Sequence, residues 1–120
     1  MDTKFRSMQL TACITTFNRP EFLSESLGSL CNQTNNNFQI LILDNGSDLK
    51  TENIILNYKK LRDNIIYEKH KPISISKQRN LALEIVKTNY LGFLDDDDFW
   101  DRNKVQEFYH HLYENNNQNI

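Results

Sequence analysis

Four consecutive aspartates, at positions 95–98, are the residues of this sequence with the clearest capacity for chemistry. They follow an apolar segment that includes Phe93 and Leu94, and Phe99 and Trp100 come directly after them. Two like charges about 4 Å apart repel each other by roughly 4 kcal/mol at an effective dielectric constant near 20. Carboxylates held between apolar anchors therefore need a cation or must take up protons. A hard divalent ion with oxygen ligands, Mn²⁺ or Mg²⁺, meets that need.

An extended backbone through this run would point Asp95 and Asp97 to one face and Asp96 and Asp98 to the other. We therefore predict a metal ion held by Asp97, with Asp95 as its partner. The alternative is a solvated acidic turn in which the four side chains spread apart in water. A metal with few protein ligands completes its shell with water and substrate phosphates, and it can neutralise the charge on a departing diphosphate.

Other phosphate-binding and metal-binding patterns are missing from the sequence. Its three glycines are Gly28, Gly46 and Gly92. Neither G-x-G-x-x-G nor G-x-x-x-x-G-K can be formed from them, so a bound diphosphate must be held mainly by metal and side chains. The adjacent His110 and His111 diverge by about a hundred degrees on a helix and cannot bind one metal together. His70 follows the third predicted strand as a candidate exposed loop residue.

The elements that must position these residues follow from the spacing of apolar residues. Apolar and β-branched runs predict strands over 10–16, 38–43, 65–68 and 90–94. Apolar residues at helical spacing predict helices after Pro20, around 54–61, over 76–87 and over about 102–114. Strands that alternate with helices predict an α/β fold, with a mostly parallel twisted sheet of about four strands and helices on both faces.

Within the first predicted helix, Pro20 occupies the first position and Asn18 or Arg19 is the expected N-cap. The apolar stripe of that helix is predicted to include Phe22 and Leu23. The domain organisation expected from the pattern is a flexible segment at 1–8, one domain over 9–114 and a flexible tail at 115–120.

The bulk composition of the 120 residues allows one domain and excludes some function classes. A net charge of −2 with scattered Lys and Arg gives no footprint for nucleic acid. No apolar stretch approaches the length of a membrane span or a signal-peptide core. We expect a cytoplasmic protein, with peripheral attachment to the cytoplasmic membrane face and oligomerisation left open. Cys13 and Cys31 fit no zinc pattern and are expected to be reduced core residues.

Three polar clusters follow predicted strands, and in an open parallel sheet ligands bind beyond the carboxyl ends of the strands. Thr15 and Phe17 end the first strand, Asp44 ends the second, and the aspartate run ends the fourth. Thr15 could supply a hydroxyl contact, while Phe17 is either a face for base stacking or a core residue. Asp44 is either an Asx-turn residue or an acceptor for a base N–H or a ribose hydroxyl. Arg79 could pair with a phosphate or with the aspartates, or it could be an ordinary surface arginine.

Four segments then carry a family resemblance, namely CITTFNRPEFLSESLGSL, ILILDNGSD, SKQRNLAL and NYLGFLDDDDFW. In order and spacing they resemble the family 2 glycosyltransferases of the GT-A fold, over about residues 9–108. The resemblance implies a transferase that uses a nucleoside-diphosphate sugar, a UDP-sugar before others, and usually inverts the anomeric centre. The acceptor, whether glycan, lipid or protein, is not specified by the resemblance.

The resemblance also implies roles for particular residues. Asp97 would hold the metal, while Asp95 and Asp96 would lie near ribose and metal; Asp44 would bind the base. Together with residues that match the family's other motifs and with Arg19, the expected nucleotide-sugar-binding set is Thr15, Phe17, Arg19, Asp44, Asp48, Arg79, Asp95 and Asp96.

Members of the family continue past the aspartate motif into an acceptor-binding half that carries the catalytic base, normally a carboxylate. This sequence ends at Ile120, so the base is expected beyond it, and the chain is either a fragment of a longer enzyme or a nucleotide-sugar-binding module without turnover. A sugar-phosphate nucleotidyltransferase would have a glycine-rich first loop where this sequence has Asn18, Arg19 and Pro20. Phosphatases of the D-x-D type place their aspartates after the first strand, whereas here they follow the fourth.

Overall fold

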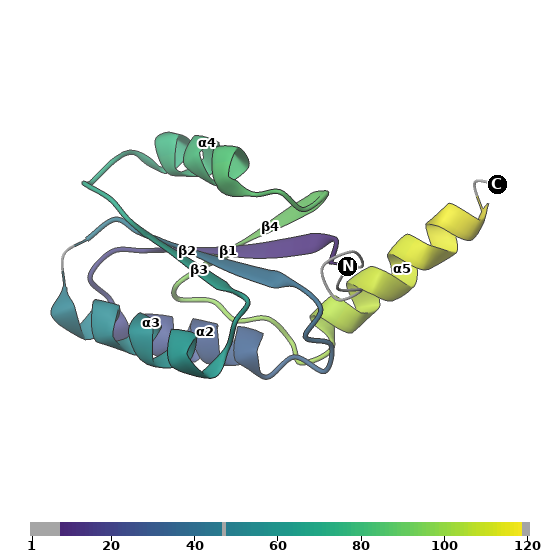
Figure 1. Cartoon of the computed structure of the whole chain (residues 1–120), viewed down its shortest axis with the longest axis horizontal. Helices are drawn as coiled ribbons and strands as arrows, with labels where there is room; N and C mark the ends of the chain where they lie inside the picture. The colour runs from purple at the N-terminus through teal and green to yellow at the C-terminus, as the bar shows by residue number, and fades with distance from the viewer. Residues whose placement is uncertain (1–7, 47, 119–120) are drawn as a thin grey trace.

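The computed structural model describes residues 8–46 and 48–118, and along these residues strands and helices alternate (Figure 1). The strands are β1 (Leu10–Thr16), β2 (Gln39–Asp44), β3 (Ile65–Lys69) and β4 (Tyr90–Asp95). The helices are α2 (Pro20–Cys31), α3 (Leu49–Leu61), α4 (Ile75–Ile85) and α5 (Lys104–Gln118).

The strands form one four-stranded sheet in the order β3-β2-β1-β4, and every neighbouring pair is parallel. Helices α2 and α3 cover one face and α4 covers the other, while α5 projects beyond one end of the sheet (Figure 1). The predicted α/β fold with a parallel sheet and helices on both faces is therefore confirmed.

Two clusters of buried apolar side chains, one on each face, hold the layers together. Successive strand residues point to opposite faces. On β1, Ile14 belongs to the cluster beneath α2 and α3, and Cys13 belongs to the cluster beneath α4. Both cysteines are free and buried, as predicted. Burial raises the pKa of the Cys13 thiol to about 12, so the side chain acts as a small apolar residue.

Helix α2 begins at the predicted residue, but the set of side chains that it buries differs from the prediction. Pro20 is the first helical residue and Arg19 is the N-cap. Leu23, Leu27 and Leu30 are fully buried, whereas Phe22, predicted on the same stripe, is 48% exposed. Phe22 lies at the flank of the stripe, three residues after Arg19, and the Arg19 guanidinium covers its ring with the central carbon 4.6 Å from the ring centroid.

The ends of the chain also differ from expectation. Helix α5 continues to Gln118, so residues 115–118, predicted as part of a flexible tail, are helical, and residues 119–120 lie outside the described residues. At the other end, Met8 is buried, while the rest of the predicted flexible segment, residues 1–7, lies outside the described residues. Among the helices that the structure describes, none has the length and apolar character needed to cross a bilayer.

Candidate functional site

Strand register brings the predicted polar clusters to one edge of the sheet. Thr16 lies opposite Asp44 across the β1–β2 pair, and Thr15 lies opposite Asp95 across the β1–β4 pair. The convergence expected from the parallel topology is confirmed, with β1 in the middle.

The aspartate run does not stay extended after β4. The backbone N–H of Asp98 donates to the carbonyl oxygen of Asp95 at 3.0 Å, which closes a tight turn. The alternation of side chains between two faces was expected only for an extended backbone, and this turn removes that condition. Asp96 points inward and is only 5% exposed, while Asp95, Asp97 and Asp98 are exposed.

Asp96 is held by a hydroxyl, a guanidinium and a hydrogen bond from the backbone of Phe17. The Thr16 hydroxyl donates to its Oδ2 at 3.0 Å, and Arg19 Nη1 lies 3.4 Å from its Oδ1. The other guanidinium nitrogen of Arg19, Nη2, lies 3.6 Å from Oδ2 of Asp97. Burial raises the pKa of Asp96, and the Thr16 hydrogen bond and the Arg19 charge oppose that rise. Arg19 thus meets part of the expected need for a cation, at Asp96 and Asp97.

A cavity of about 330 Å³ opens at this edge of the sheet. Its lining includes six of the predicted site residues, namely Thr15, Phe17, Arg19, Asp95, Asp96 and Asp97. Gln78 of α4 also lines it and is not among the predicted site residues. Gln78 is 4% exposed, and its amide nitrogen has no hydrogen-bond partner among the described residues. The available signal was a polar residue four positions before the buried Ala82 on the inward face of α4.

The donor set at this cavity fits a hard divalent cation that is incompletely ligated by protein. Asp95 and Asp97 present exposed carboxylates at the cavity, whereas the carboxylate of Asp96 is largely buried and contacts Arg19. Among the described residues, no three His, Cys, Asp or Glu side chains converge as a ready-made metal cage. Mn²⁺ or Mg²⁺ binds through one or two carboxylates when water and phosphate oxygens complete the shell.

Asp44 is fully buried and its two carboxylate oxygens have different partners. The Gly46 backbone N–H donates to Oδ1 at 3.0 Å, which confirms the Asx-turn interpretation, and the Tyr67 hydroxyl donates to Oδ2 at 2.7 Å. Burial and the bond to Asp44 raise the pKa of Tyr67. Tyr67 was not anticipated, because its position two residues before the register partner of Asp44 becomes visible only once β2 and β3 are paired. Contact of Asp44 with a nucleotide stays a prediction.

A second cavity, of about 440 Å³, adjoins the first through Phe17. The Phe17 side chain is 52% exposed, which excludes the core role left open by the sequence. His70 and Lys71, from the loop after β3, line the same cavity. The carbonyl of Lys71 lies 2.9 Å from Nδ1 of His70, so Nδ1 carries the proton that is donated. Nε2 of His70 is buried without a hydrogen-bond partner among the described residues, which is unlike the exposed loop residue expected.

Asp48 and Arg79 line neither of these two cavities. The Asp48 carboxylate caps α3 by accepting from the Lys50 backbone N–H at 2.8 Å. The Arg79 guanidinium lies over the ring of Phe93, with its central carbon 4.8 Å from the centroid. Their predicted contacts with a nucleotide remain predictions.

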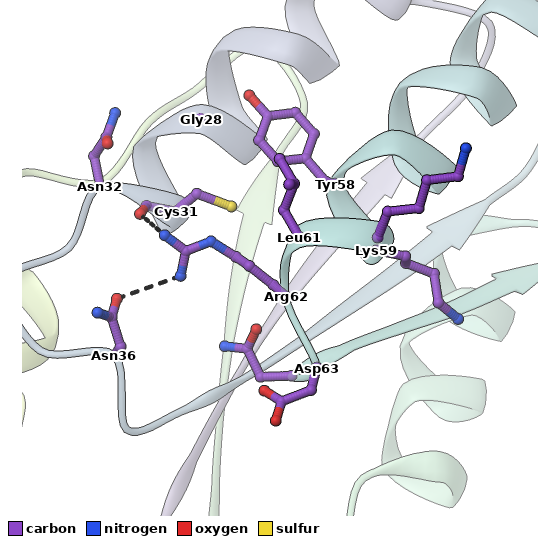
Figure 2. Close-up of a pocket in the computed structure, with 11 residues that line it drawn as sticks. Gly28, Cys31, Asn32, Asn36, Tyr58, Lys59, Leu61, Arg62 and Asp63 are labelled. Atoms are coloured by element: carbon purple, nitrogen blue, oxygen red, sulfur yellow. Dashed lines mark hydrogen bonds between the residues drawn. The ribbon is translucent and has the colours of Figure 1, made fainter.

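A third cavity lies at the other end of the sheet, where the last turns of α2 and α3 approach each other (Figure 2). It measures about 840 Å³, and Arg62 crosses it to donate to the Cys31 carbonyl and, at 3.5 Å, to Oδ1 of Asn36. Lys59 and Lys60 stand in the last turn of α3, where cations suit the helix dipole. These contacts join helix ends and loops, and the cavity is remote from the aspartates.

Comparison with known proteins places the chain in a family. The sequence model described as Glycosyl transferase family 2 matches residues 11–120. The chain belongs to this family. It is 36% identical over 92 residues to an uncharacterized glycosyltransferase of Methanocaldococcus jannaschii, across 74% of this chain and 32% of that protein.

Two solved structures share the fold. One is S. aureus TarS in complex with UDP-GlcNAc, with a TM-score of 0.81 at 23% identity, over 89% of this chain and 32% of that one. The other is a mannosyltransferase from Pyrobaculum calidifontis in complex with GDP-Man and Mn²⁺, with a TM-score of 0.72 at 16% identity, over 81% and 30%. The chain thus spans about a third of the length of each of these proteins.

Proposed function

We propose that this family 2 domain binds a nucleoside-diphosphate sugar through a divalent cation held by Asp97 and Asp95, for inverting transfer of the sugar to an acceptor. The observation that carries the proposal is the cavity of about 330 Å³ at the carboxyl edge of the sheet. Three carboxylates, one arginine and the exposed Phe17 ring line it, and they follow the ends of β1 and β4. Carboxylates that need a cation, placed beside an aromatic face, suit a ligand with both phosphates and a base.

The base and the diphosphate of the proposed ligand would occupy different cavities of the adjoining pair. The base would occupy the larger one, beside the Phe17 ring and the ring of His70. The diphosphate would occupy the cavity of the aspartates, where the Arg19 guanidinium and the Gln78 amide nitrogen, which has no hydrogen-bond partner among the described residues, can donate to it. Because Phe17 lines both cavities, a nucleotide that spans them must pass its ring.

When bound, the metal would stabilise the charge that develops on the leaving diphosphate. Asp97 and Asp95 would hold it, and Thr16 would keep the Asp96 carboxylate in its orientation through the 3.0 Å hydrogen bond. The catalytic base is expected beyond residue 120, as in the family resemblance.

The relatives support this choice of ligand. TarS was solved with UDP-GlcNAc and the archaeal mannosyltransferase with GDP-Man and Mn²⁺. We propose a UDP-sugar as the donor for this chain, with a GDP-sugar as the comparison ligand. A cytoplasmic location and a glycan, lipid or protein acceptor stay predictions.

Isothermal calorimetry with UDP, UDP-GlcNAc and GDP-Man, in Mn²⁺ and in EDTA, tests the proposal. We expect at least about tenfold tighter binding with Mn²⁺, which corresponds to about 1.4 kcal/mol. Asp97→Asn should lose the metal dependence. Asp98→Asn is the matched control, because it removes the same charge from an exposed neighbour outside the cavity lining.

Equal affinity in Mn²⁺ and EDTA, or no nucleotide binding at all, would overturn the proposal. A module without turnover predicts the same calorimetry but neither sugar transfer nor donor hydrolysis by the purified chain. Detection of either reaction would exclude that alternative.

A further inference from the structure

Arg19 occupies a position that local helix chemistry disfavours. It is the N-cap of α2, yet its side chain makes no capping hydrogen bond. Ser, Thr, Asp and Asn are preferred at an N-cap, and the positive end of the helix dipole repels a cation. Local rules are commonly broken at functional sites, where another requirement outweighs them.

The loop between β1 and α2 places Arg19 close to the carboxylates. Asn18 has a positive φ of 51°, which is uncommon for a residue other than glycine but tolerated by asparagine. Its Oδ1 accepts from the Asp48 backbone N–H at 3.0 Å. A Cβ on Gly46 would lie 2.1 Å from the same oxygen, so the loops after β1 and β2 touch here. The backbone just before Arg19 is thus anchored to the neighbouring loop.

The charges around Arg19 are unbalanced. Among the residues that the structure describes, the charged side chains that line the cavity are Asp95, Asp96, Asp97 and Arg19, so one cation faces three carboxylates there. Arg19 spans two of them, at 3.4 Å to Asp96 and 3.6 Å to Asp97. Direct charge-assisted hydrogen bonds measure about 2.7–2.9 Å, so both contacts are loose. The guanidinium also rests on Phe22, and its side chain is 42% exposed, which leaves it room to turn outward.

We propose that Arg19 is a resident counter-cation of Asp96 and Asp97 that a divalent cation displaces, and that the released guanidinium then pairs with the phosphates of the donor. The inference rests on the proposed function and deepens it. Before the nucleotide binds, Arg19 competes with the metal for the carboxylates. Once a diphosphate is present, the guanidinium has a second anion to bind, so metal and nucleotide bind cooperatively and each strengthens the other to the same extent.

The test is a titration with Mn²⁺ in which the electron paramagnetic resonance signal of free Mn²⁺ is measured, with and without UDP. Without UDP, we expect Arg19→Gln to bind Mn²⁺ at least about tenfold more tightly than the wild type, because the substitution removes a like charge that lies a few ångströms from the metal site. With UDP, the gain in Mn²⁺ affinity should be at least about tenfold smaller in Arg19→Gln than in the wild type, since the coupling is typically 5–150-fold.

Two further variants separate charge from structure. Arg19→Lys keeps the cation and should bind Mn²⁺ within about threefold of the wild type, a difference below 1 kcal/mol. Arg102→Gln removes an equal charge from an exposed residue whose carbonyl accepts from Thr34 at the other end of α2, and it should match the wild type. If Arg19→Gln proves unfolded by circular dichroism, Arg19→Lys still tests the inference through its UDP coupling, which should remain.

The failure of this inference can be distinguished from failure of the proposed function. If the wild type binds Mn²⁺ and Arg19→Gln binds it equally or more weakly without UDP, the counter-cation inference is overturned and the proposed function stands. If Arg19→Lys gains as much affinity as Arg19→Gln, or loses the coupling to UDP, the inference is also overturned. If neither the wild type nor Arg19→Gln binds Mn²⁺ with UDP present, both proposals are overturned.

Discussion

Replacement of Tyr67 by phenylalanine would remove the hydroxyl that donates to Asp44 Oδ2 at 2.7 Å and would leave the ring in place. Asp44 is fully buried, so water cannot simply take over from the lost donor. A hydrogen bond to a charged group contributes about 1.5–3 kcal/mol, and a buried acceptor left unsatisfied adds its desolvation penalty. The Gly46 N–H still serves Oδ1. We therefore expect Tyr67→Phe to lower the free energy of unfolding by about 2 kcal/mol.

Urea unfolding followed through the single tryptophan, Trp100, which is 9% exposed, measures this loss. With a denaturant slope of about 1–3 kcal/mol per M, a loss of about 2 kcal/mol lowers the midpoint by roughly 0.7–2 M. Tyr113→Phe is the control: its side chain is 53% exposed, and its change should stay within about 0.5 kcal/mol. A midpoint for Tyr67→Phe equal to that of the control would refute the assigned bond.

The pH dependence gives a second check on Tyr67. Burial and Asp44 raise the pKa of this phenol in the folded state. A raised folded pKa contributes stability that is complete below the unfolded value, about 10 for tyrosine, and is lost as pH rises beyond it. The wild type should therefore exceed Tyr67→Phe at neutral pH, and the difference in unfolding free energy should shrink above pH 10. A constant difference across that range would contradict the assignment.

Four further changes have distinct expected outcomes. In the wild type, the raised pKa of Asp96 in the folded state should make the free energy of unfolding fall as pH rises above about 4, the ordinary aspartate pKa. Asp96→Asn should lack this fall. Urea midpoints of both proteins between pH 3 and 8 test it, and parallel profiles would count against it. Phe17→Ala should leave the urea midpoint unchanged, since the ring is 52% exposed, but weaken UDP binding in calorimetry by about 1–3 kcal/mol if a base stacks there. Gln78→Met should unfold no more readily than the wild type, because it removes a buried donor that has no partner among the described residues, while UDP affinity in Mn²⁺ falls; a lower urea midpoint would show that the amide is satisfied in solution. Gly92→Ala places a Cβ 3.3 Å from the Trp100 ring, so the ring must move slightly to admit it; we expect a shifted Trp100 emission spectrum, and an unshifted one would contradict this contact.

Much of the fold could be predicted from the sequence because the relevant information is local. Buried parallel strands contain continuous apolar runs such as residues 40–43 of β2. The boundaries between elements, such as Pro20 at the start of α2, depend on a few neighbouring residues. The helix end at Gln118 was missed, because an asparagine-rich segment has no apolar stripe to indicate a helix.

Part of the site could also be predicted from the sequence, because it depends on where each strand ends. A parallel sheet brings the carboxyl ends of its strands together, so the sequence alone predicted that Thr15, Asp44 and the aspartate run would meet at one edge. It also indicated that adjacent carboxylates between apolar anchors need a cation.

Only the tertiary structure decided which aspartate turns inward and which cation faces it. Alternation of side chains holds only while the backbone is extended, and the bond from Asp98 N–H to the Asp95 carbonyl ends that geometry and buries Asp96. The approach of Arg19 to Asp96 and the hydrogen bond from Tyr67 to Asp44 depend on strand order and register, which join residues far apart in the chain. The composition of the aspartate run therefore indicated a charged site, and the turn after β4 determined how each of its carboxylates can be used.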